Sequence, residues 1–308
     1  MNRFYLLLSS GLILLSGCQH NNPDPAKNNT VTFTNNTIII KGSDTELMMV
    51  RELANEYCKI HPEIKIDVSG GGSGIGFKAL INKETEIANA SREIKSHELT
   101  EAGKQGVEPF PVMFSVDALA IVTHSRLGVD SLSTGQLQKI FSGQITNWKE
   151  LGGPDLPIHL YGRDSTSGTY SYFKEKFVPG GYASGMQHLK GNADIVNAVK
   201  KDISGIGYTG VGYLMDHNGK PTGDVWAMPV YNEGSPAYSP YEISAVKHGD
   251  YVLTRPLYQY MNGKPNTKIY DFILFELTAK GQEIIRRFGY FPINDCQKEI
   301  NHLNGLYY

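Results

Sequence analysis

The sequence lacks the motifs that identify most nucleotide-binding and ester-cleaving proteins. Its Gly-rich segment at 70–76 has neither the third glycine of a dinucleotide fingerprint nor the Gly-Lys-Ser/Thr ending of a nucleotide phosphate loop. No serine occupies a Gly-x-Ser-x-Gly elbow. None of the 9 histidines stands at metal-binding spacing from another histidine or a cysteine, and His97-Glu98 has no second histidine four residues later. We therefore expect no catalytic residue, no metal and no cofactor.

The chain also lacks an excess of either charge. Lys and Arg number 29 against 31 Asp and Glu, which gives a formal net charge of −2. Nucleic-acid binding favours a basic surface, so this balance argues against a nucleic-acid partner. Without a strong positive field, any anion must be held by local geometry. No fixed-period repeat is present, so solenoids and propellers are not expected.

Only 3 cysteines are present, and the first ends an export signal. Arg3 is the only charged side chain before an apolar run at 4–15, which is too short to span a bilayer stably. The run ends in Leu15-Ser16-Gly17-Cys18, which resembles a bacterial lipobox with cleavage before Cys18 and lipid on its sulfur. We predict a signal peptide at 1–17 and export to a membrane-anchored state. An ordinary signal peptide that happens to carry a cysteine is the alternative.

The polar stretch that follows, through residue 36, has many asparagines and few apolar residues, which is typical of a flexible tether. We predict a lipidated tether at 18–36. The remaining thiols, Cys58 and Cys296, lie far apart in sequence. In an oxidising compartment they either pair as a disulfide or remain as two buried free thiols, and the sequence leaves both open.

A strand, a Gly/Ser/Thr-rich turn and a helix start occur together three times. The three turns are Gly42–Thr45, Gly70–Gly76 and Gly162–Thr169, with helical patterns expected from Glu46, Phe77 and Tyr170. Each turn presents free backbone N–H groups and hydroxyls at the positive end of a helix dipole. If the three ends converge, they form a site for a small oxyanion.

The rest of the chain continues to alternate strands with helices. We expect strands at 86–90, 118–123 and 206–208, a helix through Phe141 opened by a Ser133/Gln136 capping box, a helix at 193–200 and one long helix at 271–288. This alternation predicts an α/β fold with ligands where helix starts meet strand ends.

Several segments together resemble the phosphate-binding lipoproteins of Pst-type ABC importers, which are periplasmic-binding proteins. The resemblance covers nearly all of 37–293, and its segments are Lys41–Thr45, Gly71–Gly74, Ile87–Arg92, Ile140–Trp148, Arg163–Thr169 and Gly289–Ile293. It implies a two-lobed α/β clamshell with two interlobe crossovers. Lobe one is expected at 37–117 plus 256–308, and lobe two at 118–255.

The resemblance also implies which residues hold phosphate in the cleft between the lobes. They are Ser43, Asp44, Thr45, Ser73, Gly74, Arg92, Arg163, Ser167, Gly168 and Thr169. The sequence departs from the family's best-known branch, which has an Asp where this chain has Arg92 and a Thr where it has Asp44. Arg92 is therefore expected either to touch the ligand or to hold Asp44. Asp164 is expected to steady Arg163, because Ser165 replaces the Asp of that branch.

The expected function is capture of inorganic phosphate outside the cytoplasm and delivery to the permease and ATPase subunits of an ABC importer, by a monomer. Two alternatives remain. One is a receptor for molybdate, tungstate or sulfate. The other is a hydrolase that uses Ser73 or Ser167 as nucleophile, although no base is paired with either serine in a recognised motif. The role of Asp44 has its own alternative, in which the side chain merely caps the helix that follows it.

Overall fold

Strands and helices alternate along the chain, as the sequence predicts. The structure is a computed structural model that describes residues 36–307, so the predicted signal peptide, Cys18 and the tether before Asn36 lie outside the described residues. The strands are β1 (Thr37–Gly42), β2 (Lys65–Ser69), β3 (Ile87–Ala90), β4 (Pro109–Thr123), β5 (Leu132–Ser133), β6 (His159–Arg163), β7 (Gln187–Leu189), β8 (Gly205–Gly210), β9 (Trp226–Met228), β10 (Val230–Tyr231) and β11 (Thr254–Asn262).

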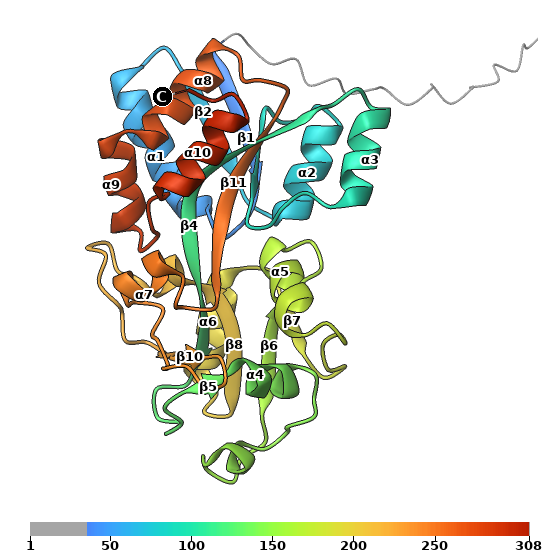
Figure 1. Ribbon diagram of the computed structural model, residues 1–308, viewed down its shortest axis with the longest axis vertical. Helices are drawn as coiled ribbons and strands as arrows, with labels where there is room; N and C mark the ends of the chain where they lie inside the picture. The colour runs from blue at the N-terminus through green and yellow to red at the C-terminus, as the bar shows by residue number, and fades with distance from the viewer. Residues whose placement is uncertain (1–35, 308) are drawn as a thin grey trace, which may run out of the picture. The chain divides into compact units, whose positions relative to one another are not determined.

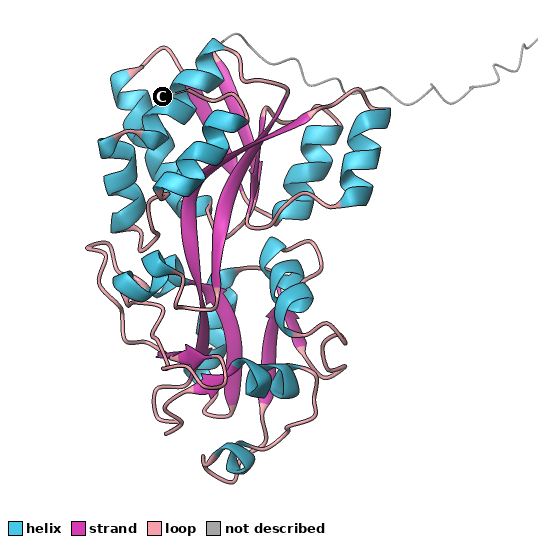
Figure 2. Cartoon of the chain, in the orientation of Figure 1, coloured by secondary structure: helices cyan, strands magenta, loops and turns pink. Residues whose placement is uncertain are grey.

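The α-helices are distributed on both sides of these strands (Figures 1 and 2). They are α1 (Leu47–Ile60), α2 (Ser73–Ile81), α3 (Ser96–Lys104), α4 (Thr134–Phe141), α5 (Gly168–Phe177), α6 (Asn192–Lys201), α7 (Ile243–His248), α8 (Thr267–Leu277), α9 (Ala279–Arg287) and α10 (Asp295–Leu303), with 3₁₀ turns η1 (Trp148–Leu151) and η2 (Val211–Leu214). Within 36–307, no helix is long and apolar enough to cross a bilayer.

One sheet runs through the described chain in the strand order β2-β1-β3-β11-β4-β8-β6-β7, with β9 paired to β4. The pairs among β1, β2 and β3 are parallel, as are those of β6 with β7 and β8. The pairs of β4 and β11 are antiparallel. Parallel strands connected by helices bring helix starts to one edge of each half of the sheet, where ligands bind in such folds.

The two long strands β4 and β11 carry the sheet from one half into the other (Figure 1). The 109–118 segment of β4 pairs with β11, whereas Leu119–Thr123 pairs with β8 and β9. The structure therefore has the two-lobed α/β architecture with two crossovers that the sequence predicts. The strand β4 changes its pairing partner after Ala118, and the lobe bounds of 37–117 plus 256–308 and 118–255 stay a prediction.

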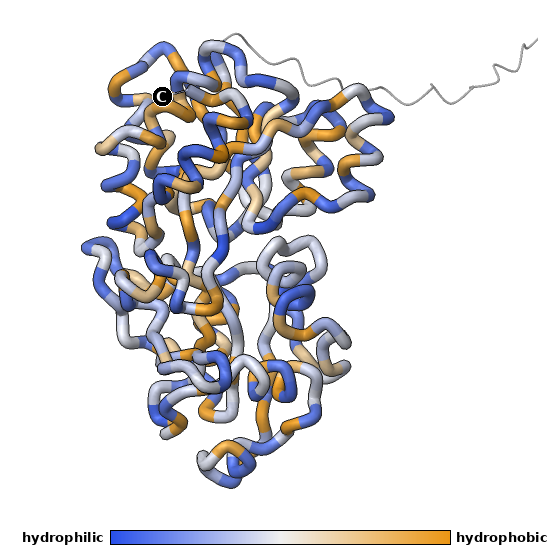
Figure 3. The backbone as a smooth tube through the Cα atoms, viewed as in Figure 1, coloured by the Kyte–Doolittle hydropathy of each residue, from blue (hydrophilic) through white to orange (hydrophobic). Residues whose placement is uncertain are grey.

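Helix α1 shows how the apolar pattern fixes an element against the sheet. Its buried face consists of Met49, Val50, Leu53, Ala54 and Tyr57, spaced as one face of a helix requires. Residues of opposite hydropathy likewise alternate along α9 in Figure 3. Burial of such faces is the main stabilisation of these helices, at about 25 cal/mol per Å² of apolar surface.

The predicted capping box is present at the start of α4. The amide of Gln136 donates to Ser133 Oγ at 3.1 Å, and the amide of Ser133 donates to Gln136 Oε1 at 2.8 Å. Two backbone donors at the helix start are thereby satisfied.

The prediction of a single long helix at 271–288 is wrong, because the structure has two helices there, α8 and α9. Thr278 has extended backbone angles (φ −66°, ψ 165°), and its hydroxyl accepts a hydrogen bond from Gly281 N at 3.2 Å. A Cβ on Gly281 would lie 2.3 Å from Phe275 O. The glycine inside the predicted helix thus permits a tight break between α8 and α9.

Two further expectations need correction. The strand expected at 118–123 is the end of the much longer β4, whose first residues include Pro109 and Pro111. The two remaining cysteines are free, Cys58 half-buried and Cys296 exposed. The disulfide is therefore absent from this structure, and the alternative of two buried thiols fails for Cys296.

Candidate functional site

The three Gly/Ser/Thr-rich turns all lead into helices, at α1, α2 and α5. Two of these helices begin earlier than predicted: α2 begins at Ser73 instead of Phe77, and α5 at Gly168 instead of Tyr170. The early start of α2 depends on Gly72, whose φ of 104° is a left-handed value that other residues rarely adopt. Ser73 therefore lies in the first turn of its helix.

The starts of α2 and α5 meet, although their turns are far apart in sequence. Gly74 N donates to Thr166 O at 2.9 Å, and the Thr166 hydroxyl lies 3.1 Å from Gly71 O. The two helix starts approach so closely that only glycine fits at positions 72 and 168. A Cβ on Gly72 would lie 2.5 Å from Thr166 O, and one on Gly168 would lie 2.2 Å from Ser73 Oγ.

The start of α1 meets α5 through two threonines. Thr45 Oγ1 and Thr169 Oγ1 are 3.0 Å apart, and both residues are at least 98% buried. Ser73 Oγ accepts from Ser91 N at 3.1 Å, so the end of β3 joins the same cluster. Ser43 is buried beside Thr45 and is held by a hydrogen bond from its amide to Asn89 O at 2.8 Å.

Three backbone amides at the starts of α1 and α5 have no recorded acceptor among the described residues. They are the amides of Thr45, Gly168 and Thr169, which precede or begin α1 and α5. Unpaired N–H groups at the positive ends of helices bind anions. Together with the hydroxyls, they form the convergent donor set that the sequence predicts.

Arg163 adds a buried positive charge to the cluster. The side chain is 1% exposed, and its Nη2 donates to Lys190 O at 2.6 Å. Its Nη1 lies 3.5 Å from Asp44 Oδ2, while its Nε is buried and has no partner in the part of the chain described. Burial lowers the pKa of Arg163, and the nearby Asp44 carboxylate opposes that change. The unpaired Nε is a donor left for a ligand.

Asp44 bonds to the other side of the site instead of capping α1. Its Oδ2 accepts from both N and Nδ2 of Asn192, at 3.0 and 3.1 Å. Asn192 is the first residue of α6, so the carboxylate caps α6, whereas α1 begins after Glu46 without a side-chain cap. Its Oδ1 accepts no hydrogen bond from the described residues.

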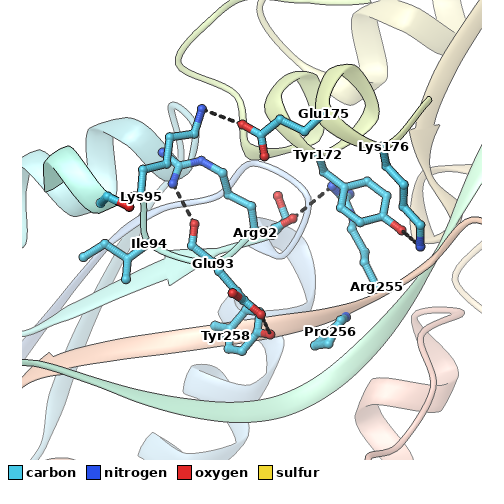
Figure 4. A pocket seen from close by; sticks show the side chains of 12 residues that line it. Arg92, Glu93, Ile94, Lys95, Tyr172, Glu175, Lys176, Arg255, Pro256 and Tyr258 are labelled. Carbon is cyan, nitrogen blue, oxygen red and sulfur yellow. Dashed lines mark hydrogen bonds and ion pairs between the residues drawn. The ribbon is translucent and has the colours of Figure 1, made fainter. Parts of the chain in front are cut away.

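Arg92 is bonded away from these groups. Its guanidinium donates to both oxygens of Glu98 at 2.7 Å and to Glu93 O at 2.8 Å, and it lies 4.9 Å over the Phe77 ring. None of its recorded contacts is with Asp44. Arg92 instead lines a pocket of about 530 Å³ beside the cluster, and Figure 4 shows it there with side chains of α5.

Asp164 makes no recorded hydrogen bond to the Arg163 side chain, but its charge, after that of Asp44, opposes the lowering of the Arg163 pKa by burial and so favours the charged guanidinium. Asp164 Oδ1 accepts from the backbone and hydroxyl of Thr166, at 3.1 and 2.5 Å. The carboxylate thereby shapes the turn before α5. Lys190 O and Asp44 contact the guanidinium of Arg163 in its place.

Sequence reasoning missed Arg255 and Asp117, which lie directly opposite each other on β11 and β4. Arg255 is 1% exposed, Asp117 is fully buried, and Arg255 Nη2 is 2.7 Å from Asp117 Oδ2. Burial raises the pKa of Asp117, and the hydrogen bonds from Arg255 oppose the rise. No turn or motif marks either residue, so the only available signal was a charged residue inside an otherwise strand-like segment.

Neither candidate nucleophile has a base beside it. Ser73 Oγ contacts the amide and the hydroxyl of Ser91, and Ser167 Oγ accepts from Tyr170 N as the cap of α5. Across residues 36–307, no group of three or more His, Cys, Asp or Glu side chains is placed to hold a metal ion. The arrangement is suited to binding an oxyanion.

Comparison with known proteins agrees with this fold and site. Residues 27–280 match the PBP superfamily domain. The phosphate-binding protein PstS of Pseudomonas aeruginosa is 30% identical over 270 residues, covering 82% of this chain and 81% of that protein. Protein SphX of Synechococcus elongatus is 31% identical over 262 residues, covering 82% and 76%. The chain therefore belongs to the PBP superfamily, in the family that includes these PstS proteins.

Solved structures give the same result. A Clostridium perfringens substrate-binding protein assigned to phosphate ABC transport, solved with bound phosphate, has a TM-score of 0.72 and 28% identity, covering 84% of this chain and all of that chain. An ABC-type phosphate transport receptor from Vibrio cholerae has a TM-score of 0.65 and 25% identity, covering 83% of this chain and 100% of the other.

Proposed function

We propose that this protein is an extracytoplasmic receptor, and not an enzyme, that captures inorganic phosphate and delivers it to an ABC importer. The observation that carries the proposal is that the starts of α1, α2 and α5 contact one another, while Asp44 before α1 lies 3.5 Å from the buried Arg163, whose Nε has no partner among the described residues. The PstS protein and the two solved structures named above, whose names include phosphate, support the same ligand.

The proposed ligand contacts are Ser43, Asp44, Thr45, Ser73, Gly74, Arg163, Ser167, Gly168 and Thr169. An oxyanion that leaves water must have most of its lone pairs satisfied. Hydrogen bonds to a charged group contribute about 1.5–3 kcal/mol each, so five or six exceed the roughly 8 kcal/mol of a micromolar complex even after ordering costs. Arg92 is also a proposed contact: its two Nη groups are bonded to Glu98, whereas its Nε is buried without a partner among the described residues.

Asp44 gives the site a means to distinguish phosphate from sulfate. Phosphate near neutral pH carries a proton, and sulfate does not. The free Oδ1 of Asp44 can accept a hydrogen bond from the protonated oxygen, whereas a sulfate oxygen there would meet a carboxylate with no shared hydrogen. A site built around such a bond rejects the analogue that lacks it by orders of magnitude.

We further propose that lipid on Cys18 anchors the protein to a bacterial membrane through the tether at 18–36, and that it acts as a monomer. The permease and ATPase subunits of a Pst-type importer would then receive phosphate from a receptor held at the membrane surface. The support is the lipobox-like sequence and the names of the relatives.

Native mass spectrometry of the mature chain tests the ligand. After incubation with equal concentrations of phosphate, sulfate and molybdate, we expect one phosphate per chain. A spectrum dominated by another oxyanion would favour the alternative receptor. Release of product from a chromogenic phosphate ester would instead support a hydrolase.

A further inference from the structure

The guanidinium of Arg255 contacts both sides of the proposed site. Its Nη2 lies 3.3 Å from Thr45 Oγ1 and 3.0 Å from Thr169 Oγ1. We propose that Arg255 is a positioning residue that occupies lone pairs of these two threonine hydroxyls and so turns one hydroxyl hydrogen of the pair toward the ligand. The inference rests on the proposed function, since it concerns the same oxyanion site.

Arg255 is held too firmly to reorient. Its Nε and Nη2 donate to Asp117 Oδ2 at 2.9 and 2.7 Å, and its Nη1 donates to Ser91 O at 3.1 Å. Its guanidinium carbon lies 5.4 Å from the centre of the Tyr172 ring. Figure 4 shows the two side chains next to each other in the pocket. Asp117 is itself fixed, because its Oδ1 accepts from Val211 N at 3.2 Å.

The direction of the threonine hydrogens follows from counting. A hydroxyl has one hydrogen to donate and two lone pairs to accept with. One threonine donates to the other across their 3.0 Å contact. Arg255 Nη2 has two hydrogens: one bonds to Asp117 Oδ2, and the other is shared between the two threonine oxygens. The threonine that accepts from its neighbour and from Arg255 has both lone pairs occupied, and its own hydrogen is free to donate to a ligand. The other threonine keeps one unoccupied lone pair.

This arrangement favours one orientation of phosphate. The hydrogen that the Thr45/Thr169 pair offers is met by an unprotonated ligand oxygen. The protonated oxygen is then left for an acceptor, and Asp44 Oδ1 is a carboxylate oxygen with no hydrogen bond from the described residues. Asp117 compensates the charge of Arg255. Arg255 therefore adds little net charge to the site and acts mainly by orienting the threonine hydroxyls.

The same contacts depend on closure of the two lobes. Thr45 precedes α1 in proposed lobe one, whereas Thr169 lies in α5 of proposed lobe two. Arg255 is on the crossover strand β11, opposite Asp117 on β4. A single nitrogen can therefore contact both hydroxyls only when the two sides are together, which links ligand recognition to closure.

The test is a double-mutant cycle on Arg255 and Thr169, read by calorimetric titration of the mature chain with phosphate. Arg255→Lys keeps the charge but cannot reach Asp117, Ser91 O and both hydroxyls at once. We expect its phosphate Kd to rise about tenfold or more, and that of Thr169→Val to rise similarly. The double variant should lose much less than the product of the two factors, because both changes remove one hydrogen bond.

Controls separate positioning from general damage. Arg287→Lys, at an exposed arginine bonded to Glu52 away from the site, should leave phosphate affinity unchanged. Thermal unfolding without phosphate reports folding. If Arg255→Lys does not fold, the neutral pair Arg255→Gln/Asp117→Asn replaces it in the cycle, since it leaves no unpaired buried charge.

Each outcome decides the proposal. Wild-type affinity in Arg255→Lys, or losses that multiply in the double variant, would overturn the role of Arg255 and leave the phosphate receptor intact. If wild type prefers sulfate or molybdate, the same cycle is measured with that anion. Binding of none of the three anions would overturn both the receptor and the role of Arg255.

Discussion

Asp44 Oδ2 and Arg163 Nη1 lie 3.5 Å apart, joining two turns that are remote in sequence. Asp44 follows β1, and Arg163 ends β6, so the pair bridges the two halves of the sheet. Asn192 at the start of α6 bonds to the same carboxylate oxygen. The acid that we expect to recognise the proton of phosphate is thus held by groups from the opposite side, which couples recognition to closure.

Removing the guanidinium should abolish most phosphate binding. Arg163→Ala deletes a charge-assisted donor from a buried position, and such losses cost about 2–5 kcal/mol, or roughly 30-fold to several-thousand-fold in Kd. We also expect phosphate to compact the wild-type chain in small-angle scattering, and we expect no such compaction in Arg163→Ala. Calorimetric titration measures the affinity.

The matched control for Arg163→Ala is Arg126→Ala, at an exposed arginine without a recorded side-chain contact. It should bind phosphate like wild type. Equal affinities for Arg163→Ala and wild type would remove Arg163 from the site.

Asp44→Asn should weaken phosphate binding and permit sulfate binding. Asparagine keeps an oxygen that can accept from Asn192, but it removes the negative charge that repels sulfate. We expect at least about a tenfold loss for phosphate and measurable heat with sulfate. If the variant keeps wild-type phosphate affinity and still excludes sulfate, Asp44 only holds α6, and another acceptor selects phosphate.

The turns of the site could be predicted because their chemistry is local. Glycine at the tight positions, hydroxyls at helix starts and alternating strands are all visible in sequence, and the structure brings Thr45, Ser73 and Thr169 into one cluster as expected. The starts of α2 and α5 were placed too late because the Gly/Ser-rich turns were assumed to be non-helical throughout.

Arg255 and Asp117 could not be predicted, because cross-strand register brings them together. They are opposite each other in the β4–β11 pair and far apart in sequence. Arg92 lies in a segment that carries the family resemblance, yet its partner Glu98 comes from the neighbouring helix α3, which the sequence did not reveal. The break at Thr278 was missed because apolar periodicity continues across α8 and α9.

Glu46 should make the protein less stable as pH rises. Burial raises its pKa well above the ordinary value, and Asp117 and Glu276 raise it further, while Ser43 and Arg255 oppose the rise. A raised pKa means that the folded state holds a proton that the unfolded state releases. The contribution of protonated Glu46 to the free energy of unfolding is fully present below the unfolded-state pKa. It is lost as pH rises toward the folded-state pKa.

Glu46→Gln should remove that loss. Thermal unfolding without ligand gives the melting temperature of the variant minus that of wild type. This difference should be larger at pH 8 than at pH 5. Glu283→Gln changes an exposed glutamate on α9 and should show no such trend. A pH-independent difference for Glu46→Gln would mean that the buried carboxyl does not titrate between the two states.

Cys18→Ala should release the protein from membranes while leaving phosphate affinity unchanged. The lipid would be attached to this sulfur, whereas the described site begins beyond the tether. Membrane fractionation with and without detergent measures the effect, and phosphate titration of the released protein provides the control. A Cys18→Ala protein that is processed and still needs detergent for release would contradict lipid anchoring at Cys18.

Calorimetric titration of the mature wild-type chain with phosphate, sulfate and molybdate tests the central claim most directly. We expect one phosphate site with a Kd of about micromolar or tighter, in keeping with five or six charge-assisted hydrogen bonds. Sulfate and molybdate should give no comparable binding. Absence of phosphate binding, or tighter binding of either other anion, would contradict a phosphate receptor.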